Sequence, residues 1–312
     1  MGMMIVKRVL RGILTLFITI VVVFALVRAV PGDPAQLLAG SDATEEQIQE
    51  MRVSWGLDKP ITEQFWIYVK KLATGDVGVS YQFMVGGKAT TPVSSLVFSR
   101  LPRTLLLAVC TLIFSMLCAI PLGVLCALKP GSLFDNLVTN LNLFITSFPG
   151  FYIAMVLILL FALRLNWLPT GGYGTIREMI LPTLCLSTRF IASLTRVTRA
   201  EVGMILNSDY IRTAKSKGLR RSAVLFKHAL RNAAIPIVTL IGMRFSKLVT
   251  GSVYIEALFR FNGMGQLLIS SVNVRDYPTI QALIPYTALM FIACNIVVDL
   301  LYGAIDPRVR NK

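Results

Sequence analysis

The chain has 312 residues, a formal net charge of +15 and a mean hydropathy of +0.68. Only 15% of its residues are charged, against roughly 25% in soluble domains, which argues against a soluble enzyme and favours a polytopic membrane protein. In such a protein the excess of Lys and Arg acts first on topology, because positive loops stay in the cytoplasm, so we expect no nucleic-acid partner.

Six mostly apolar stretches approach the length of about 20 residues that a helix needs to cross a bilayer. The first covers residues 12–27, and no small-residue cleavage site follows it, so we expect a signal-anchor helix over residues 1–28 rather than a removed signal peptide. The other five cover residues 104–128, 136–163, 179–197, 233–255 and 279–302. The sequence therefore predicts an all-α membrane protein with six transmembrane helices.

Residues 29–100 form the longest segment between two predicted spans. Thr44 is suited to cap a helix and Gly56 to end one, so we expect a small external helical subdomain here. The third span contains Pro149, which removes a backbone donor, so we expect a kink at that point. The remaining residues, 101–312, form the predicted five-helix membrane core.

A strongly basic segment follows the fourth span. Residues 196–231 hold nine Lys or Arg and two acids, and placing those bases in the bilayer costs on the order of 25 kcal/mol. This segment therefore lies in the cytoplasm, and with six spans both termini lie there too. The alternative for such a basic amphipathic stretch is that it lies on anionic lipid.

The basic segment has the signals of a helix, a turn and a second helix. Ser208 or Asp209 is a suitable N-cap, residues 210–217 suit two helical turns, and Gly218 suits a left-handed stop. Ser222 can cap a second helix. That helix has an apolar face that runs into the fifth span and comprises Phe226, Ala229, Leu230 and Ala233.

Several motifs resemble one family in their expected order. "VPGDPAQLLAG", "LNWLPTGGYG", "DYIRTAKSKGL" with "HALRNAAIP", "GSVYIEALFRFNGMGQL" and "DPRVR" are similar to the permease subunits of binding-protein-dependent ABC importers, in the dipeptide, oligopeptide and nickel branch. The resemblance covers essentially the whole chain and implies the type I ABC importer permease fold. It also implies a bacterial or archaeal plasma membrane, the inner membrane in a Gram-negative cell.

The resemblance implies that residues 198–232, which cover most of the basic segment, form a coupling element that docks on an ATPase subunit. Arg212, Thr213 and Ala214 stand where the broader family has Glu-Ala-Ala, and Gly218 matches its turn glycine. The full set of coupling residues that we expect is Asp209, Tyr210, Arg212, Thr213, Ala214, Lys217, Gly218 and Leu219.

The sequence contains no recognisable ATP-binding motif. Its nearest approach to a phosphate-binding loop, "VGGKATT", lacks the required glycine and hydroxyl positions. We therefore expect no enzyme activity, no catalytic residue, no cofactor and no metal site in this chain. The resemblance implies that two separate ATPase subunits bind ATP and Mg, and that the other partners are a second homologous permease, an external solute-binding protein and the lipid bilayer.

Charged residues inside predicted spans are candidates for the transport path, because burying them in lipid is costly. Arg244 and Lys247 lie three residues apart and so share a helix face; we expect them to face the pathway and attract carboxylates, the alternative being an ion pair with a partner subunit. For Arg189 we expect a structural position, with its side chain extended toward the cytoplasmic interface. Ser147, Pro149 and Gly251 complete the expected path.

Residues that follow the fifth span form an expected external gate. Glu256, Gly263 and Gly265 are its candidate residues, and a plain connecting loop is the alternative. For the function we expect uptake of di- or oligopeptides, with nickel, a metal chelate or glutathione as the alternative cargo. An ion-driven secondary carrier is the alternative from another class, although the predicted spans hold few acids for coupling ions.

Overall fold

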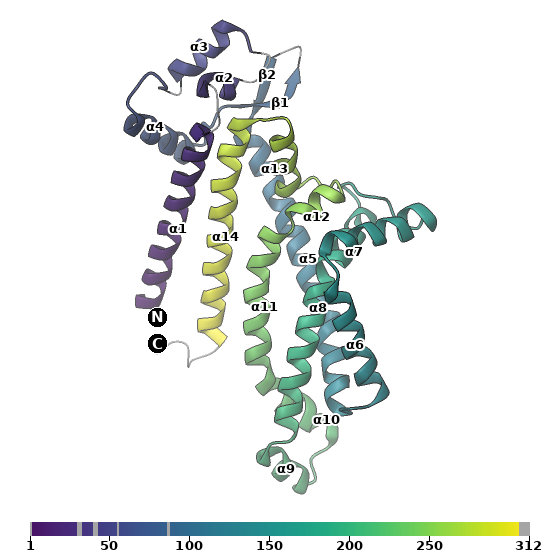
Figure 1. Cartoon of the computed structure of the whole chain (residues 1–312). Helices are drawn as coiled ribbons and strands as arrows, with labels where there is room; N and C mark the ends of the chain where they lie inside the picture. The colour runs from purple at the N-terminus through teal and green to yellow at the C-terminus, as the bar shows by residue number, and fades with distance from the viewer. Residues whose placement is uncertain (1, 30–32, 40–42, 55, 86–87, 306–312) are drawn as a thin grey trace. The chain divides into compact units, whose positions relative to one another are not determined.

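The computed structural model describes residues 2–29, 33–39, 43–54, 56–85 and 88–305 (Figure 1). Within them the chain divides into two units. The central unit holds residues 105–261 and the last helix from residue 294 onward, and the flanking unit holds residues 2–104 and 262–293. The terminal "DPRVR" motif, which carries part of the cytoplasmic assignment of the C-terminus, lies outside the described residues.

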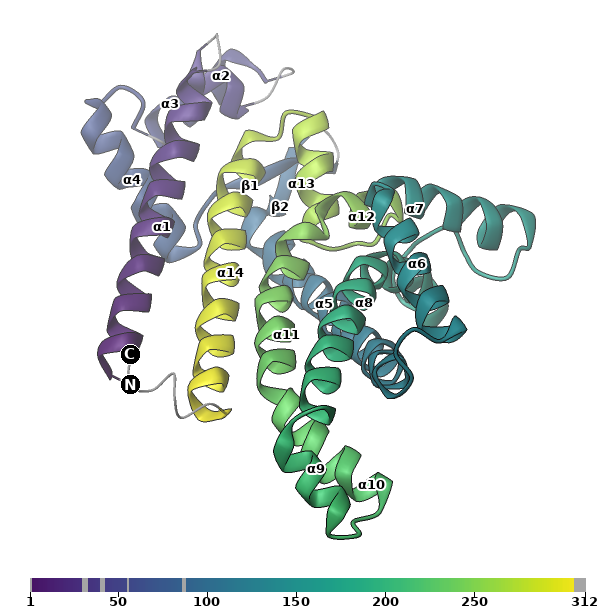
Figure 2. The same ribbon diagram turned by 60° about the horizontal axis from the view of Figure 1, so that its bottom comes forward.

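In the flanking unit, α1 (Gly2–Ala29) lies beside the first part of α14 (Tyr277–Ile305), as Figures 1 and 2 show. The two helices approach closely at Gly12, where an added Cβ atom would lie 2.6 Å from Ile292 Cγ2. The short amphipathic helix α4 (Ile61–Thr74) packs against both. Its Tyr68 ring stacks on Phe24 at 5.9 Å, and the Tyr68 hydroxyl donates a 2.8 Å hydrogen bond to the Gln281 carbonyl.

Burial raises the pKa of the Tyr68 hydroxyl above its usual range, so this group stays protonated and remains a hydrogen-bond donor. A second tyrosine repeats the contact, because the Tyr286 hydroxyl donates to the Leu72 carbonyl at 2.8 Å. These two hydrogen bonds, one buried and one half-buried, fix α4 against α14.

The helices α2 (Pro34–Ala39) and α3 (Glu45–Ser54) share a small apolar core of Ala35, Ala39 and Ile48. The predicted cap of α3 is confirmed, because the Thr44 hydroxyl accepts from the Gln47 amide while the Gln47 side chain accepts from the Thr44 amide. The predicted stop is confirmed as well, since Gly56 follows the helix with φ of 58°.

Contrary to our prediction of a helical subdomain, the segment between residues 29 and 100 is not purely helical. It contains an antiparallel hairpin of β1 (Val79–Val85) and β2 (Lys88–Pro92), in which Val79 lies opposite Pro92. The sequence carries a signal for it, since two stretches with β-branched residues flank a Gly-Gly pair at 86–87. The second predicted span also begins earlier than expected, because α5 covers Val93–Leu128.

A buried carboxylate ties this hairpin to the start of α14. Asp276 is fully buried just before the helix, after α13 (Met264–Asn273). It accepts hydrogen bonds from the hydroxyl groups of Ser80 on β1 and of Thr279, the latter at 2.7 Å, and from the Thr279 amide. The carboxylate therefore acts as a helix cap and as a link between strand and helix.

Replacing Asp276 with alanine should destabilise the flanking unit by about 1–3 kcal/mol, because it leaves buried donors without an acceptor. The measurement is the melting temperature of the purified protein in detergent. Asp276→Asn keeps one acceptor oxygen and replaces the other with an NH2 group, so it should lower the melting temperature less than the alanine variant. Equal melting temperatures for the alanine variant and the wild type would contradict this role.

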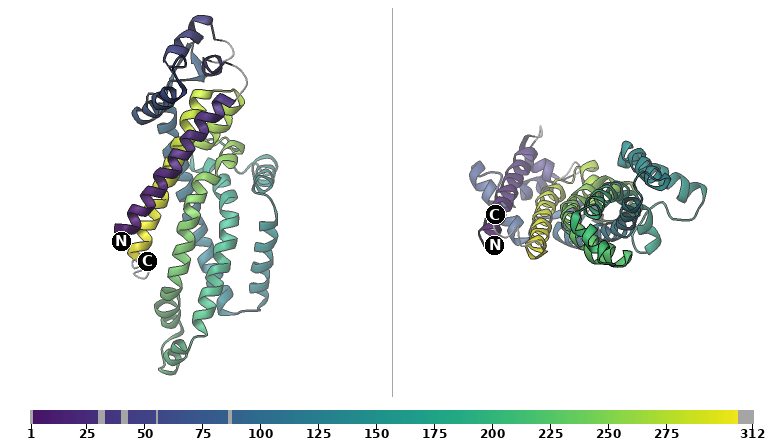
Figure 3. Two further views of the ribbon diagram at one scale, coloured as in Figure 1. Left: turned by 60° about the vertical axis from the view of Figure 1, so that its left-hand side comes forward. Right: turned by 90° about the horizontal axis from the view of Figure 1, so that it is seen from below.

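The central unit is a set of packed helices. After α5 come α6 (Leu133–Ser147), α7 (Gly150–Leu157), the π-helix η1 (Ile158–Arg164), α8 (Ile176–Leu206), α11 (Arg231–Gly251) and α12 (Val253–Leu258). Helices α8 and α11 lie side by side (Figure 3) around an apolar core that includes Phe190, Leu194, Ile237 and Ile241. The fifth predicted span is interrupted at Ser252, because α11 ends at Gly251 and α12 begins at Val253.

The kink predicted at Pro149 is confirmed and proves to be a full break. Helices α6 and α7 meet there at 102°, with Pro149 as the N-cap of α7. The pyrrolidine ring fixes φ at −60° and removes the amide that would continue α6, so the chain turns at this point.

Within the described residues, four helices are long and apolar enough to cross a bilayer, or five if α6 and α7–η1 form one broken span. These are α1, α5, α14 and a helix over Arg221–Phe245 that includes most of α11. Helix α8, which holds the predicted fourth span, is not among them, since Arg189, Arg196 and several hydroxyl residues lower its hydropathy. The helical membrane architecture is confirmed, and the total of six spans stays a prediction.

Candidate functional site

The predicted coupling element is a helical elbow at the end of α8. It consists of α9 (Asp209–Ser216), a turn at Gly218, and α10 (Arg221–Ala223), which continues through the π-helix η2 (Val224–Leu230) into α11 (Figure 2). The turn is a Schellman motif, because the Gly218 amide donates to Lys215 and the Leu219 amide donates to Ala214. Gly218 has φ of 76°, so the predicted left-handed stop is confirmed.

A small apolar core holds the elbow together. Ile211 and Ala214 from α9 are buried against Val224, and Ile205 and Leu206 at the end of α8 pack on the same cluster. On the outside, the Asn232 amide donates to the Tyr210 hydroxyl at 3.0 Å. Because α9 contacts the helices before and after it, the elbow is a stiff joint between α8 and α11.

Three details of the predicted elbow differ in the structure. Ser208 occupies the N-cap position, but its hydroxyl donates to the Ile205 carbonyl instead of accepting from α9. Ser222 does not cap the second helix, which already begins at Arg221 after the N-cap residue Arg220. On the predicted apolar face, Ala229 and Ala233 are buried but Phe226 is 67% exposed, because the π-helical turns shift the register of side chains around the axis.

The elbow presents a polar, mostly basic outer face. Asp209, Tyr210, Arg212, Thr213, Lys217, Gly218 and Leu219 from the expected coupling set are all exposed. Ala214 belongs to the same set but is only 7% exposed and points into the elbow core. A partner that docks here therefore meets the seven exposed residues, while Ala214 supports their position.

A buried ion pair fixes the arm that carries the elbow. Arg199 of α8 forms two hydrogen bonds to the Asp135 carboxylate of α6, at 2.5 and 2.6 Å. The Asp135 carboxylate also accepts from the Gly131 amide at 2.8 Å, at the start of α6. The Asp135 side chain is 1% exposed and that of Arg199 is 39% exposed. Sequence reasoning missed this pair, because its members are 64 residues apart and each has an ordinary local role.

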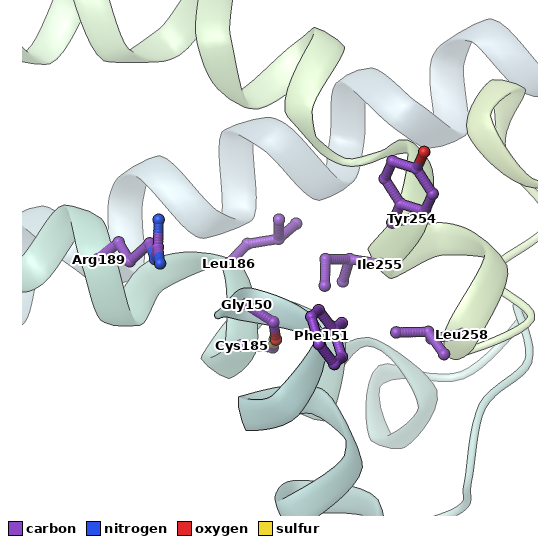
Figure 4. Close-up of a pocket in the computed structure, with 8 residues that line it drawn as sticks. All are labelled: Gly150, Phe151, Cys185, Leu186, Arg189, Tyr254, Ile255 and Leu258. Carbon is purple, nitrogen blue, oxygen red and sulfur yellow. The ribbon is translucent and has the colours of Figure 1, made fainter. Parts of the chain in front are cut away.

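A second site lies at the break between α6 and α7. A pocket of about 590 Å³ is lined by Gly150, Phe151, Cys185, Leu186, Arg189, Tyr254, Ile255 and Leu258, all in the central unit. Arg189 lies at one end of it and Leu258 at the other (Figure 4). The lining is largely apolar, so the exposed guanidinium of Arg189 is its main polar group.

Arg189 makes a backbone contact at the helix break, and the expected extension of its side chain toward the cytoplasmic interface stays a prediction. One of its terminal nitrogens donates a 2.9 Å hydrogen bond to the Phe148 carbonyl, across the break from α8. The Cys185 thiol lies near the Gly150 carbonyl at 3.5 Å. The break leaves the Phe148 carbonyl, just after the end of α6, without an intrahelical donor, and Arg189 of α8 supplies one. Arg189 keeps further N–H groups for a ligand in the pocket.

The other expected path residues lie in the central unit but outside this lining. Arg244 is half-buried, Lys247 is exposed, and both lie on α11, which Gly251 ends. Ser147 and Pro149 are exposed at the break itself.

The three expected gate residues belong to different units. Glu256 is fully buried in the central unit, where it accepts a 2.8 Å hydrogen bond from the Ser252 hydroxyl. Gly263 and Gly265 are buried in the flanking unit, at the start of α13. Gly263 has φ of −104°, so the turn here does not require a glycine.

Residues 119–311 match the family described as "Binding-protein-dependent transport system inner membrane component". Residues 1–108 match its companion, "Binding-prot-dependent transport system membrane comp, N-term". The chain belongs to this family of permeases. The permease is therefore a multi-pass inner-membrane component of an ABC importer, as the resemblance implied, and the alternative of an ion-driven secondary carrier is set aside.

Two relatives show how close the match is. The permease is 41% identical over 308 residues to the glutathione transport system permease protein GsiC of Escherichia coli K12, with 99% of both chains covered. It is 41% identical over 307 residues to the GsiC protein of Pectobacterium atrosepticum, with 98% of both chains covered.

The fold has a solved counterpart. A chain of the inward-facing MetNI methionine ABC transporter superimposes with a TM-score of 0.59 at 15% identity, covering 70% of the permease and 99% of that chain. At this identity the likeness concerns the fold alone, and it confirms the type I importer permease fold.

Proposed function

We propose that the permease forms half of a pathway for ATP-driven import of glutathione or a similar small peptide. The observation that carries this proposal is the 41% identity to glutathione permeases over 99% of both chains. Glutathione is a tripeptide, so this cargo lies within the peptide class that the sequence motifs indicate. A bare nickel ion is less favoured, because the pocket lining offers one thiol and no imidazole or carboxylate.

The assembly follows from the family. We propose a second homologous permease, two ATPase subunits that bind ATP and Mg, and an external solute-binding protein that delivers the cargo. In this assembly the basic elbow and both termini face the cytoplasm, because loops rich in Lys and Arg, such as residues 196–231 with nine of them, stay on the cytoplasmic side. The exposed outer face of α9 then meets an ATPase, and residues 29–100 face the binding protein.

The pocket at the α6–α7 break suits the passage of such a cargo. Its apolar walls offer no fixed partner to most peptide groups, while Arg189 can form paired hydrogen bonds with a carboxylate. Glutathione carries two carboxylates, and every linear peptide carries one at its C-terminus.

The test is uptake by the complete importer in liposomes loaded with ATP and supplied with the binding protein. Labelled glutathione should accumulate, and accumulation should require ATP. Unlabelled dipeptides, glutathione amide and nickel salts serve as competitors. Uptake that only nickel inhibits, or uptake of dipeptides but not glutathione, would overturn the proposed cargo without affecting the family assignment.

Replacing Arg189 with glutamine should reduce glutathione uptake about tenfold, because one charge-assisted hydrogen bond to a carboxylate contributes roughly 1.5–3 kcal/mol. Arg189→Lys keeps the positive charge but loses the two-pronged geometry of the guanidinium group. Its glutathione uptake should therefore lie between that of the wild type and that of Arg189→Gln. The measurement is the initial uptake rate at several concentrations. A uniform loss with glutathione and glutathione amide would indicate only damage to the helix break.

Arg244 and Lys247 have a separate expected effect on selectivity. Replacing both with glutamine should lower uptake of acidic peptides relative to basic ones, because the pathway loses two positive charges. The measurement is competition between matched acidic and basic tripeptides for uptake. Unchanged relative uptake would remove both residues from the pathway and favour an ion pair with a partner subunit.

A further inference from the structure

Helix α4 leaves one large aromatic side chain uncovered. Trp66 is 64% exposed and lies on the side of the helix away from the packed residues Tyr68 and Leu72. At about 100° per residue, Trp66 and Ala73 lie within about 20° of each other and form the open face of the helix. Glu63 and Lys70 lie about 40–60° further around the axis, so a charged face directly borders the open face.

The position of α4 along α1 fixes what can meet the open face. The Phe65 ring lies 5.3 Å from the Phe24 ring and 6.1 Å from the Phe17 ring of α1. At 1.5 Å per residue, Phe24 lies about 6 Å and Phe17 about 16 Å from Arg28 along α1, toward the middle of the span. Both belong to the membrane-spanning part of α1, residues Val6–Ala29. The packed face of α4 therefore reaches below the membrane surface.

Arg28 marks that surface. Its guanidinium stacks 3.5 Å above the Phe24 ring and donates two hydrogen bonds, of 2.6 and 3.1 Å, to the Gln64 side chain of α4. An arginine that ends an apolar span extends its charge to the headgroup region. Gln64 thus lies at the level of the headgroups while Phe65 points into the hydrocarbon, which is the arrangement of a helix lying in the interface plane.

We propose that the open face of α4 is covered by lipid and that α4 anchors the flanking unit in the leaflet at the Ala29 end of α1. The exposed apolar side chains of α1, including Phe17 and Leu26, continue the same surface toward the membrane interior. Trp66 then acts as an interfacial anchor, because its indole combines a large apolar ring with one polar N–H group. The charged face with Glu63 and Lys70 points to water.

The test measures where the Trp66 indole lies in the complete importer, reconstituted in lipid nanodiscs. The emission of Trp66 is the difference between the wild type and Trp66→Phe, which removes no other tryptophan. Three conditions are compared: plain lipids, lipids brominated on the acyl chain near the headgroup, and plain lipids with iodide in the buffer. The matched control moves the tryptophan to an exposed acidic position on the polar helix α3, in the double variant Trp66→Phe, Glu46→Trp.

Brominated lipid should remove most of the Trp66 emission while iodide has little effect, and the control tryptophan should show the reverse pattern. Strong quenching by iodide at Trp66 would place it in water and overturn the proposal. Insensitivity to both quenchers would show that another protein subunit covers this face, which also overturns it. The result does not depend on the cargo, so it is independent of the proposed substrate.

Discussion

Replacing Ala214 with aspartate should abolish uptake by the assembled importer. Ala214 is buried in the elbow core with Ile211 and Val224, so an introduced carboxylate would lie among apolar side chains. Burying an unpaired polar group costs roughly 2–7 kcal/mol, which is enough to open the packing between α9 and η2. A loosened joint can no longer pass a discrete motion from an ATPase to α8 and α11.

Two measurements check this prediction, namely uptake into liposomes and stimulation of ATP hydrolysis by the loaded binding protein. Both should be lost in Ala214→Asp. The matched control is Ala214→Cys, which keeps a small apolar side chain and should retain most of the activity. If the aspartate variant imports cargo normally, the elbow does not transmit the motion.

The buried pair of Asp135 and Arg199 should respond asymmetrically to the removal of either partner. Arg199→Ala leaves a carboxylate that is 1% exposed without its cation, and breaking a buried pair in this way costs about 3–5 kcal/mol. Asp135→Ala leaves an arginine that is 39% exposed and that water can reach, so its cost should be clearly smaller. Both variants should weaken the attachment of α8 to the start of α6.

The double variant Asp135→Ala, Arg199→Ala completes the cycle. It removes both charges, so it should be more stable than Arg199→Ala alone. The measurement is the melting temperature of each purified complex, compared with that of the wild type. Equal losses in the two single variants, or a double variant that is the least stable of all, would show that the pair does not act as a buried ion pair.

Local signals in the sequence predicted local structure well. The Thr44 cap, the left-handed Gly56 and Gly218, and the break at Pro149 all depend on residues within one or two turns of each other, and the structure confirms them. The long apolar stretches also predicted α1, α5 and α14, because the thickness of the bilayer sets the length of an apolar helix that crosses it.

The hairpin shows a local signal that was present but not used. Its strands have β-branched residues on both sides of a Gly-Gly pair, but the segment lies between amphipathic helices and was assigned with them. The interrupted fifth span also had a local signal that was not used. A Gly-Ser pair, Gly251 and Ser252, stands at the break and is a typical kink site, and α12 then packs beside α7 and α8.

The amino-acid sequence by itself therefore determined the membrane class, the family and the position of the elbow, because hydropathy, charge and motif order are properties of the chain. The tertiary structure decided which side chains meet. It turned Ala214 inward, placed Arg189 at the carbonyl of the α6–α7 break, and joined Asp135 to Arg199. Helical spacing reports only which residues share a face, and the partner of that face depends on which helices pack together.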